Sequence, residues 1–310
     1  MPLSTSNSDL TIIIFKLAAG VMVFWVLSFG IYLILDYMYF RTDSGTTGAQ
    51  INHIIKSSFD GYIMGASRAA HHYDTKAISD KLGFRFFNAG DDGKNATYQL
   101  GLLKMMIKNH VPKVIIYEIG DMSPSLDKGS IDLYPYYYKD EEIKFLLNQR
   151  DKLAKVKFLL PIFVYNRKLF PVLYWYFSSV PPPTNGYRPL QGSMHSAEQE
   201  ALSKLEYRTG TSIIDPNAYY SFQQFIRTCK DLDIKLVLAY SPSYVPSDPS
   251  GYDVILSIAT KHNLPVYNYG QDKRFNWDPQ LFKDSTHMNE SGARIFSDLI
   301  GTDILTTIHQ

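Results

Sequence analysis

The sequence contains a single cysteine, Cys229, among its 310 residues. An internal disulfide is therefore excluded, and so is a zinc or iron–sulfur centre built from clustered cysteines. An excess of charge is also missing, because 31 Lys and Arg residues face 30 Asp and Glu residues. This balance excludes a disordered polyelectrolyte and gives no reason to expect a nucleic-acid partner. Cys229 ends a helical pattern, and we interpret it as a small buried residue of the core.

One long apolar segment, Leu17 to Leu35, has 19 residues and no charge. As a helix it would be roughly 29 Å long, which matches the apolar core of a bilayer. Lys16 and Asp36 flank it, and aromatic residues follow it as they do at a membrane–water interface: Tyr37, Tyr39 and Phe40. A buried core helix would show a polar face, and a cleaved signal peptide would end in small residues; this segment does neither. We therefore predict a short tail at 1–16, a transmembrane anchor at 17–35 and a linker at 36–52.

The charges beside this segment do not orient it, because Lys16 lies before it and Arg41 lies after it. A short tail, one span and a long remainder fit a signal-anchor whose domain is exported. We therefore expect a single-pass protein of the cytoplasmic membrane, with its domain in the periplasm or at the cell surface.

Beyond the linker, strand and helix patterns alternate. The pattern predicts strands at 61–65, 84–88, 113–119, 234–240 and 265–268, and helices at 68–82, 95–109, 251–262 and 291–300. Such alternation implies right-handed crossovers and a parallel sheet with helices on both faces. We predict a three-layer α/β/α domain over 53–310, interrupted by an irregular insertion at about 121–228.

The insertion contains an aromatic run, Leu169–Phe177, which is too short to span a bilayer and includes Pro171. Packing against the core is one interpretation of this run. A lid, a substrate groove and an interfacial contact beside the anchor are the others, because Tyr and Trp suit sugar faces and lipid headgroups alike.

Three segments place polar residues after predicted strands, where parallel sheets build their sites. In Gly65-Ala66-Ser67-Arg68 a hydroxyl stands at the start of a helix, where a developing negative charge is favoured. The segment 88–95 (NAGDDGKN) has glycines that let backbone N–H groups approach a ligand. Asp284 precedes His287 by three residues, so its carboxylate can fix the tautomer of the imidazole. Each segment taken alone also fits an ordinary cap or turn.

Together these segments resemble the SGNH (GDSL-like) hydrolase superfamily. Gly65-Ala66-Ser67 stands where that family has Gly-Asp-Ser, Asn88 with Gly93 matches its second block, and Asp284-x-x-His287 matches its last. The resemblance implies a flavodoxin-like sheet, with Ser67 as nucleophile, His287 as general base and acid, and Asp284 as its orienting partner. It also implies that the N–H groups of Ser67 and Gly93 receive the oxyanion. We expect no cofactor and no metal; the pair His71-His72 has no ligand one helical turn away.

Two positions depart from the family pattern. The Asn that completes the oxyanion hole should follow Ile119, where this chain has Gly120-Asp121-Met122-Ser123. Losing one such donor can cost on the order of 10²-fold in rate, and Asn95 is a candidate replacement. Arg68 follows the nucleophile, where it either holds an anionic group of the substrate or pairs with a carboxylate such as Asp91 or Asp92.

The resemblance and the anchor together predict a bacterial serine esterase or acyltransferase that acts on ester-linked acyl groups, such as acetyl, of cell-envelope polysaccharide. Two alternatives stay open. One is a catalytically weak relative that serves as a membrane-tethered binding or assembly factor in polysaccharide export, and the other is a lipase acting on membrane lipids. The expected partners are an acylated carbohydrate and the membrane, without nucleic acid.

Overall fold

A computed structural model describes residues 7–42, 48–120, 129–178, 183–205, 214–249 and 251–309. The chain forms two compact units. The first comprises Met1–Thr42 and Tyr134–Ser179, and the second comprises Asp43–Leu133 and Val180–Gln310. Part of the predicted insertion therefore groups with the apolar N-terminal segment, and the rest groups with the α/β fold.

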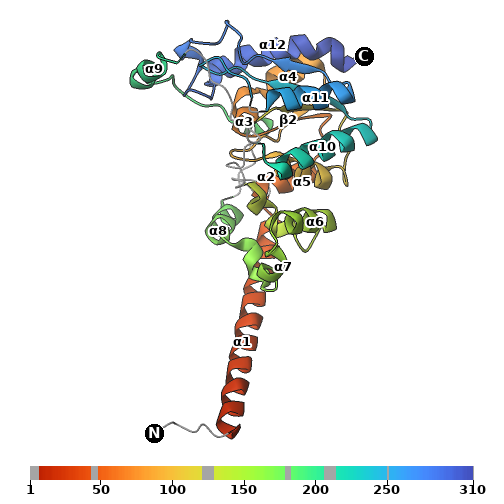
Figure 1. Cartoon of the computed structure of the whole chain (residues 1–310), viewed down its shortest axis with the longest axis vertical. Helices are drawn as coiled ribbons and strands as arrows, with labels where there is room; N and C mark the ends of the chain where they lie inside the picture. The colour runs from red at the N-terminus through yellow and green to blue at the C-terminus, as the bar shows by residue number, and fades with distance from the viewer. Residues whose placement is uncertain are drawn as a thin grey trace. The chain divides into compact units, whose positions relative to one another are not determined.

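The first unit contains a long apolar helix, α1 (Asn7–Tyr39), drawn in red in Figure 1. By length and composition, the stretch Asp9–Phe40 is able to cross a membrane. The helix is longer than the predicted 17–35 span because apolar residues also precede Lys16. It is exposed on every side from Asp9 to Leu27, whereas one face is buried from Ser28 onward.

The first unit also contains the short helices α6 (Glu141–Arg150), α7 (Ala154–Lys157), η3 (Pro161–Tyr165) and α8 (Leu169–Phe177), of which η3 and α8 cover that buried face. The buried positions of α1 recur at helical spacing, and they include Ser28, Tyr32, Leu35 and Tyr39. The most extensive packing of α1 is with η3 and α8. Asp36 of α1 accepts a hydrogen bond from the Tyr165 hydroxyl at 3.0 Å and pairs with Lys139 at 2.8 Å. The aromatic run at 169–177 is therefore a helix packed beside the apolar helix.

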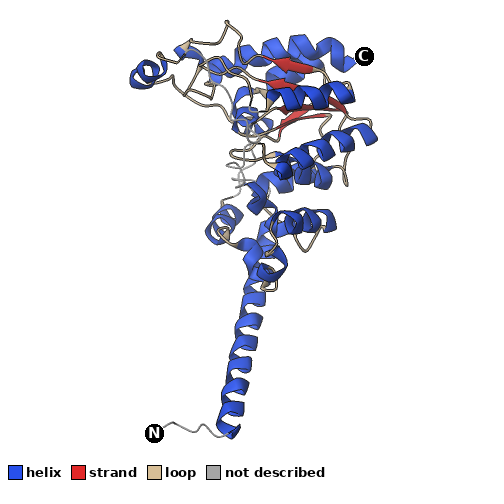
Figure 2. Ribbon diagram, in the orientation of Figure 1, coloured by secondary structure: helices blue, strands red, loops and turns tan. Residues whose placement is uncertain are grey.

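The second unit is built on a sheet of five parallel strands in the order β2-β1-β3-β4-β5. The strands are β1 (Gly61–Met64), β2 (Phe86–Asn88), β3 (Val114–Glu118), β4 (Lys235–Tyr240) and β5 (Val266–Asn268). They are red in Figure 2. Each strand lies inside a predicted one, and the strand order is that of flavodoxin-like folds. This confirms the predicted parallel α/β architecture, which an apolar helix precedes in the sequence.

Helices cover both faces of this sheet. On one side α12 (Glu290–His309) packs along α4 (Thr75–Leu82) and α3 (Ser67–His72), and on the other α10 (Pro216–Asp231) packs on α5 (Ala96–Met106), which also contacts α2 (Gly48–Lys56) (Figure 1). The remaining elements are η2 (Gly129–Tyr136), η4 (Pro183–Gly186), α9 (Ser196–Leu202), α11 (Tyr252–His262) and η5 (Pro279–Leu281).

Three local features differ from the sequence prediction. The predicted helix at 68–82 is two helices, because the Asp74 carboxylate accepts the N–H groups of Lys76 and Ala77 and starts α4 anew. The predicted linker at 36–52 includes the end of α1 and the beginning of α2. The part of the insertion before Cys229 is the regular helix α10, which Asp215 caps and Pro216 begins. Cys229 itself is buried, as expected, and burial raises the pKa of its thiol.

Candidate active site

The candidate nucleophile leaves the sheet through a tight turn at Gly65, directly after β1. Gly65 has φ +147°, which disfavours any residue with a side chain. An added Cβ would lie 2.9 Å from the Glu118 carbonyl oxygen on the neighbouring strand β3. Only glycine lets the chain pass this close, and the turn places Ser67 at the first position of α3.

Three predicted site residues form one hydrogen-bonded chain. The Ser67 Oγ lies 2.8 Å from the His287 Nε2, and the His287 Nδ1 lies 2.9 and 3.0 Å from the two carboxylate oxygens of Asp284. Ser67 follows β1, whereas Asp284 and His287 precede α12, so the fold joins residues separated by 220 positions. This is the geometry that a serine, a base and an orienting carboxylate need for nucleophilic attack.

Asp284 is held as an acceptor by its own turn. Its Oδ1 receives the backbone N–H groups of Thr286 and His287, each at 2.9 Å. Burial alone would raise the pKa of Asp284, but hydrogen bonds from the His287 ring and from these two N–H groups hold it below its ordinary value. A carboxylate that only accepts requires the proton on Nδ1 of His287, which leaves Nε2 free to accept the proton of Ser67.

The loop after β2 approaches α3 through Gly90 rather than Gly93. An added Cβ at Gly90 would lie 2.4 Å from the Ala70 nitrogen, so the loop and the helix touch through their backbones. Internal acceptors take the N–H groups of residues 90, 91, 92 and 94. In the described part of the chain the N–H of Gly93, at φ +68°, has no such acceptor, which keeps Gly93 as a candidate oxyanion donor.

The side chain of Asn95 caps a helix. Its Oδ1 accepts the N–H groups of Thr97 and Tyr98 at the start of α5. No described contact joins Asn95 to Ser67, so its candidacy as a replacement oxyanion donor gains no support from the geometry. The departing segment Asp121-Met122-Ser123 lies outside the described residues.

Arg68 pairs with a carboxylate, which was one of its two expected roles, but the partner is Glu118, so the suggested partners Asp91 and Asp92 are wrong. The Arg68 Nε lies 3.1 Å from the Glu118 carboxylate at the end of β3, and its guanidinium lies over the Tyr240 ring at 3.9 Å. Asp91 pairs instead with Lys94 and Arg188, and Asp92 with His71 and Arg188. Glu118 is fully buried and is the nearer partner once β3 lies beside β1.

Glu118 is the centre of a buried network that sequence reasoning missed. Its carboxylate accepts the Tyr73 hydroxyl, the Ser241 N–H at 3.1 Å and the Ser241 hydroxyl at 2.8 Å. Burial raises the pKa of Glu118, but Arg68 and these donors oppose the rise and favour the ionised form. A glutamate at the end of the apolar strand VIIYE was the available sequence signal, because a buried charge needs partners.

The network continues to the segment that carries the base. His72 Nε2 accepts the N–H of Met288 at 3.0 Å, so its Nδ1 is the donor to the Ser241 Oγ at 2.7 Å. The Ser241 hydroxyl accepts from His72 and from Arg68 and donates to Glu118, which uses its full hydrogen-bonding capacity. Burial holds the pKa of His72 well below its ordinary value, so this ring is neutral. Arg68 is next to Ser67 and Met288 is next to His287, so one network braces both segments.

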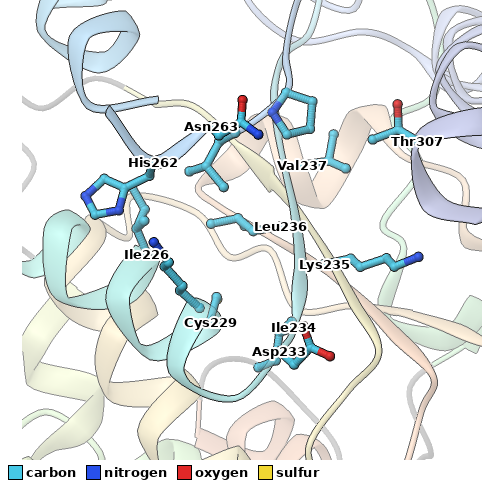
Figure 3. Close-up of a pocket in the computed structure, with 13 residues that line it drawn as sticks. Ile226, Cys229, Asp233, Ile234, Lys235, Leu236, Val237, His262, Asn263 and Thr307 are labelled. Atoms are coloured by element: carbon cyan, nitrogen blue, oxygen red, sulfur yellow. The ribbon is translucent and has the colours of Figure 1, made fainter. Parts of the chain in front are cut away.

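A separate pocket lies at the opposite edge of the sheet. Its lining comes from α10, β4 and α11 and includes Cys229, Lys235 and His262 (Figure 3). Lys235 begins β4, whereas Ser67 follows the carboxyl end of β1. The pocket therefore shares neither residues nor location with the Ser67–His287–Asp284 chain.

No known family model matches the chain, and no curated protein matches it. It is similar to a solved structure from Bacteroides fragilis assigned as an acylhydrolase, with 12% identity, a TM-score of 0.38 and coverage of 80% of this chain and 87% of that one. It is also similar to an acetyl xylan esterase, with 11% identity, a TM-score of 0.38 and coverage of 79% and 99%. A two-domain esterase active on acetylated mannans has 11% identity and a TM-score of 0.38; the match covers 84% of this chain and 52% of the esterase.

Proposed function

We propose that the protein is a serine esterase or acyltransferase of SGNH type that acts on ester-linked acyl groups, such as acetyl, of bacterial envelope polysaccharide. The observation that carries this proposal is the hydrogen-bonded chain from Ser67 through His287 to Asp284. Serine is a weak nucleophile alone, and a base at 2.8 Å whose tautomer is fixed by a carboxylate is the arrangement that activates it.

In the proposed reaction the Ser67 Oγ attacks the ester carbonyl while its proton moves to the His287 Nε2. The resulting imidazolium is stabilised by Asp284, and the N–H groups of Ser67 and Gly93 receive the oxyanion. Collapse of the tetrahedral intermediate breaks the bond to the leaving alcohol, which takes the proton from His287, and leaves the acyl group on Ser67. Water or a sugar hydroxyl then attacks the acyl-enzyme, with His287 again taking the proton. The second tetrahedral intermediate breaks the bond to the Ser67 Oγ, which takes that proton back from His287, and the acid or the acylated sugar is released.

Hydrolase and transferase differ in which acceptor enters at the second step, and both use the same three residues. The two are separated by supplying an acetyl ester together with a carbohydrate acceptor and following where the acetyl group goes. Acetylated carbohydrate identifies a transferase, whereas free acetate alone identifies a hydrolase.

We further propose that α1 anchors the protein in the cytoplasmic membrane with the second unit outside the cytoplasm. The length and apolar composition of α1 support a span. Its packing supports retention rather than cleavage, because the face that begins at Ser28 is covered by η3 and α8 and would be left incomplete without it. Resistance of the full chain to alkaline extraction from membranes tests the anchor.

The nucleophile is tested by reacting the full chain with a fluorophosphonate and locating the adduct by mass spectrometry. Ser67 displaces fluoride and forms a phosphonate ester if His287 activates it. The expected adduct is on Ser67, absent in Ser67→Ala and present in Ser57→Ala, which removes a hydroxyl outside the site. An unmodified Ser67 in folded protein would refute nucleophilic catalysis.

The polysaccharide target is tested in cells that carry Ser67→Ala in place of the natural chain. A change in the acyl content of the surface polymer supports the proposal. Unchanged acyl content, with export of the polymer dependent on the protein, would favour the alternative role as a binding or assembly factor. Turnover of long-chain phospholipid esters that requires Ser67 would favour the lipase.

A further inference from the structure

The charge of the chain is unevenly distributed. Residues 152–178 of the first unit hold five basic residues and no acidic residue, in a chain whose formal charge is only +1: Lys152, Lys155, Lys157, Arg167 and Lys168. We call Lys152–Ser178 the basic segment. It comprises α7, η3, α8 and the turns beside them, all in the same unit as α1. Lys152, Lys155 and Arg167 are exposed, whereas Lys157 pairs with Asp151 and Lys168 is buried.

The basic segment also presents large apolar side chains to its surroundings. Around α7 they are Leu153, Val156 and Leu159, which recur every third residue and are 60%, 63% and 72% exposed. On α8 they are Phe170, Tyr174 and Phe177, which recur every three to four residues and are 79%, 61% and 79% exposed. The second set lies along one side of α8, and the first follows the same spacing through α7 and the turns beside it. Soluble surfaces rarely leave apolar side chains gathered in this way, so a partner is expected to cover them.

One hydrogen bond fixes the level of this surface along α1. The Trp25 indole Nε1 donates to the Leu159 carbonyl oxygen at 3.1 Å. Trp25 belongs to the stretch Asp9–Phe40, which is able to cross a membrane. As a helix this stretch is about 48 Å long, which exceeds the roughly 30 Å of a bilayer core, so its ends reach the headgroups. Leu159 therefore lies beside a part of α1 that the proposed span keeps within the membrane.

We infer that the basic segment is embedded in one leaflet beside α1 and binds anionic phospholipids. This inference rests on the proposed anchor and adds a second membrane contact to it. The apolar sides of α7 and α8 face acyl chains, and the exposed basic residues Lys152, Lys155 and Arg167 face phosphate headgroups, as basic and apolar residues do in interfacial helices. The bond from Trp25 gives the Leu159 carbonyl the partner that an apolar medium requires.

A second copy of the chain is the other occupant that such a surface admits. Pairing two copies through it would bring the three exposed positive charges of one copy, on Lys152, Lys155 and Arg167, near those of the other. Anionic headgroups offset the same charge. The composition therefore favours lipid.

The test places a fluorophore on single cysteines of the full chain in nanodiscs that contain phosphatidylglycerol. Cys229 is buried and is replaced by Ser. Labels go on Phe170→Cys and Phe177→Cys, with Leu27→Cys of α1 as the lipid-exposed reference and Tyr220→Cys of α10 as the aqueous reference. Leu27 and Tyr220 are 63% and 52% exposed, so both accept a label without repacking. Quenching by nitroxide on lipid acyl chains is compared with quenching by aqueous iodide.

The expected result is that the labels at 170 and 177 are quenched by nitroxide lipid at least half as strongly as the label at 27, and are protected from iodide relative to the label at 220. Iodide quenching equal to that at 220 overturns the inference. Protection from both quenchers together with crosslinking between copies also overturns it and identifies a second copy instead. A label at 27 that nitroxide lipid does not quench would instead refute the anchor itself.

A charge variant tests the headgroup contact separately. Lys152→Glu with Lys155→Glu should weaken nitroxide quenching at 177 by about half when phosphatidylglycerol is present and change little in neutral nanodiscs. The reason is that each basic residue near an anionic surface strengthens binding to it by about fivefold. The matched control is Lys261→Glu with Lys273→Glu, two exposed positions of the second unit, which should leave the quenching unchanged. An equal effect of both pairs would refute a specific headgroup contact. Esterase activity on a soluble ester reports Ser67 independently and stays intact in either pair.

Discussion

Ser241→Ala should lower catalysis although Ser241 touches none of the three proposed catalytic residues. The hydroxyl is fully buried and joins His72, Arg68 and Glu118. Its removal leaves the His72 Nδ1–H without an acceptor, which costs about 1–3 kcal/mol for a buried donor. The His72 ring then regains a hydrogen-bond partner by rotating or by admitting a water molecule. Either change breaks the hydrogen bond from the N–H of Met288, the residue that follows His287.

The size of the kinetic effect follows from how tightly the base is placed. The Ser67 Oγ to His287 Nε2 distance is 2.8 Å, so a small displacement of the imidazole weakens the hydrogen bond through which the proton moves. A loss of about 1.4 kcal/mol in the transition state lowers kcat about tenfold. We therefore expect kcat to fall on the order of tenfold and KM to stay unchanged, because the hydroxyl contacts no substrate.

Ser243→Ala is a matched control on the same loop. Ser243 is also buried, and its Oγ donates to the Val245 carbonyl at 2.8 Å and contacts the Ser247 Oγ at 2.7 Å, away from His72. Both variants lose a buried hydroxyl and should unfold at similarly lowered temperatures. Steady-state kinetics on a soluble acetyl ester, measured well below those temperatures, separate positioning from stability. Equal kcat in the two variants would refute the idea that the network positions His287.

Three further outcomes follow from the site. Asp284→Asn should lower kcat on the order of 10³- to 10⁴-fold and slow fluorophosphonate labelling in parallel, because the amide no longer fixes the His287 tautomer. The control Asp272→Asn loses an ion pair with Arg274 outside the site and should keep the wild-type rate. A mild loss of activity in Asp284→Asn would contradict the proposed role. Burial lowers the pKa of His72, so the unfolded state binds a proton below about pH 6.5 that the folded state does not. Stability measured by urea unfolding should therefore fall as the pH falls from 7 to 5, and His72→Gln should show a smaller fall. Gly65→Ala should prevent folding of the second unit, because the new Cβ would meet the Glu118 carbonyl at 2.9 Å in a backbone conformation that alanine avoids; a native circular dichroism spectrum and Tm would contradict this.

The sheet was accessible from the sequence because each strand is a short apolar run that ends at a turn. The run Ile234–Tyr240 predicts β4 within one residue, and the same holds for Pro265–Asn268 and β5. Strand order then followed from the resemblance and from the handedness of the crossovers. The break at Asp74 was missed because a single capping carboxylate decides it, within an otherwise continuous helical pattern.

Only part of the site could be predicted from the sequence, because some of its contacts join residues that are far apart along the chain. Asp284 and His287 belong to one turn, and their spacing encodes their contact. The partner of Arg68 is 50 residues away on β3, and choosing it over the sequence neighbours Asp91 and Asp92 requires knowing that β3 lies beside β1. Ser241 carried no signal at all, since an isolated buried serine has no pattern.

The first unit was the least accessible. The aromatic run at 169–177 fits a core element, a lid or an interfacial helix equally well by composition. Its location is decided by the side of α1 that begins at Ser28, more than a hundred residues earlier. The spacing of apolar residues shows that one face of a helix is packed against something, but it does not identify the segment that packs there.

The change of surroundings along α1 at Ser28 has a mechanical consequence. A bare apolar helix spins about its own axis in a bilayer and orients nothing that is attached to it. Here the part of the helix after Ser28 cannot rotate freely, because one side of it is packed against the rest of the first unit. The buried side contains Tyr32, Leu35 and Tyr39, and the exposed side contains Ile31, Leu33 and Ile34. Any torque or tilt imposed on the helix is therefore transmitted to residues 134–178 as a rigid rotation. Inserting one alanine after Leu27 would turn the lower helix by about 100° relative to that packed side without changing its apolar character.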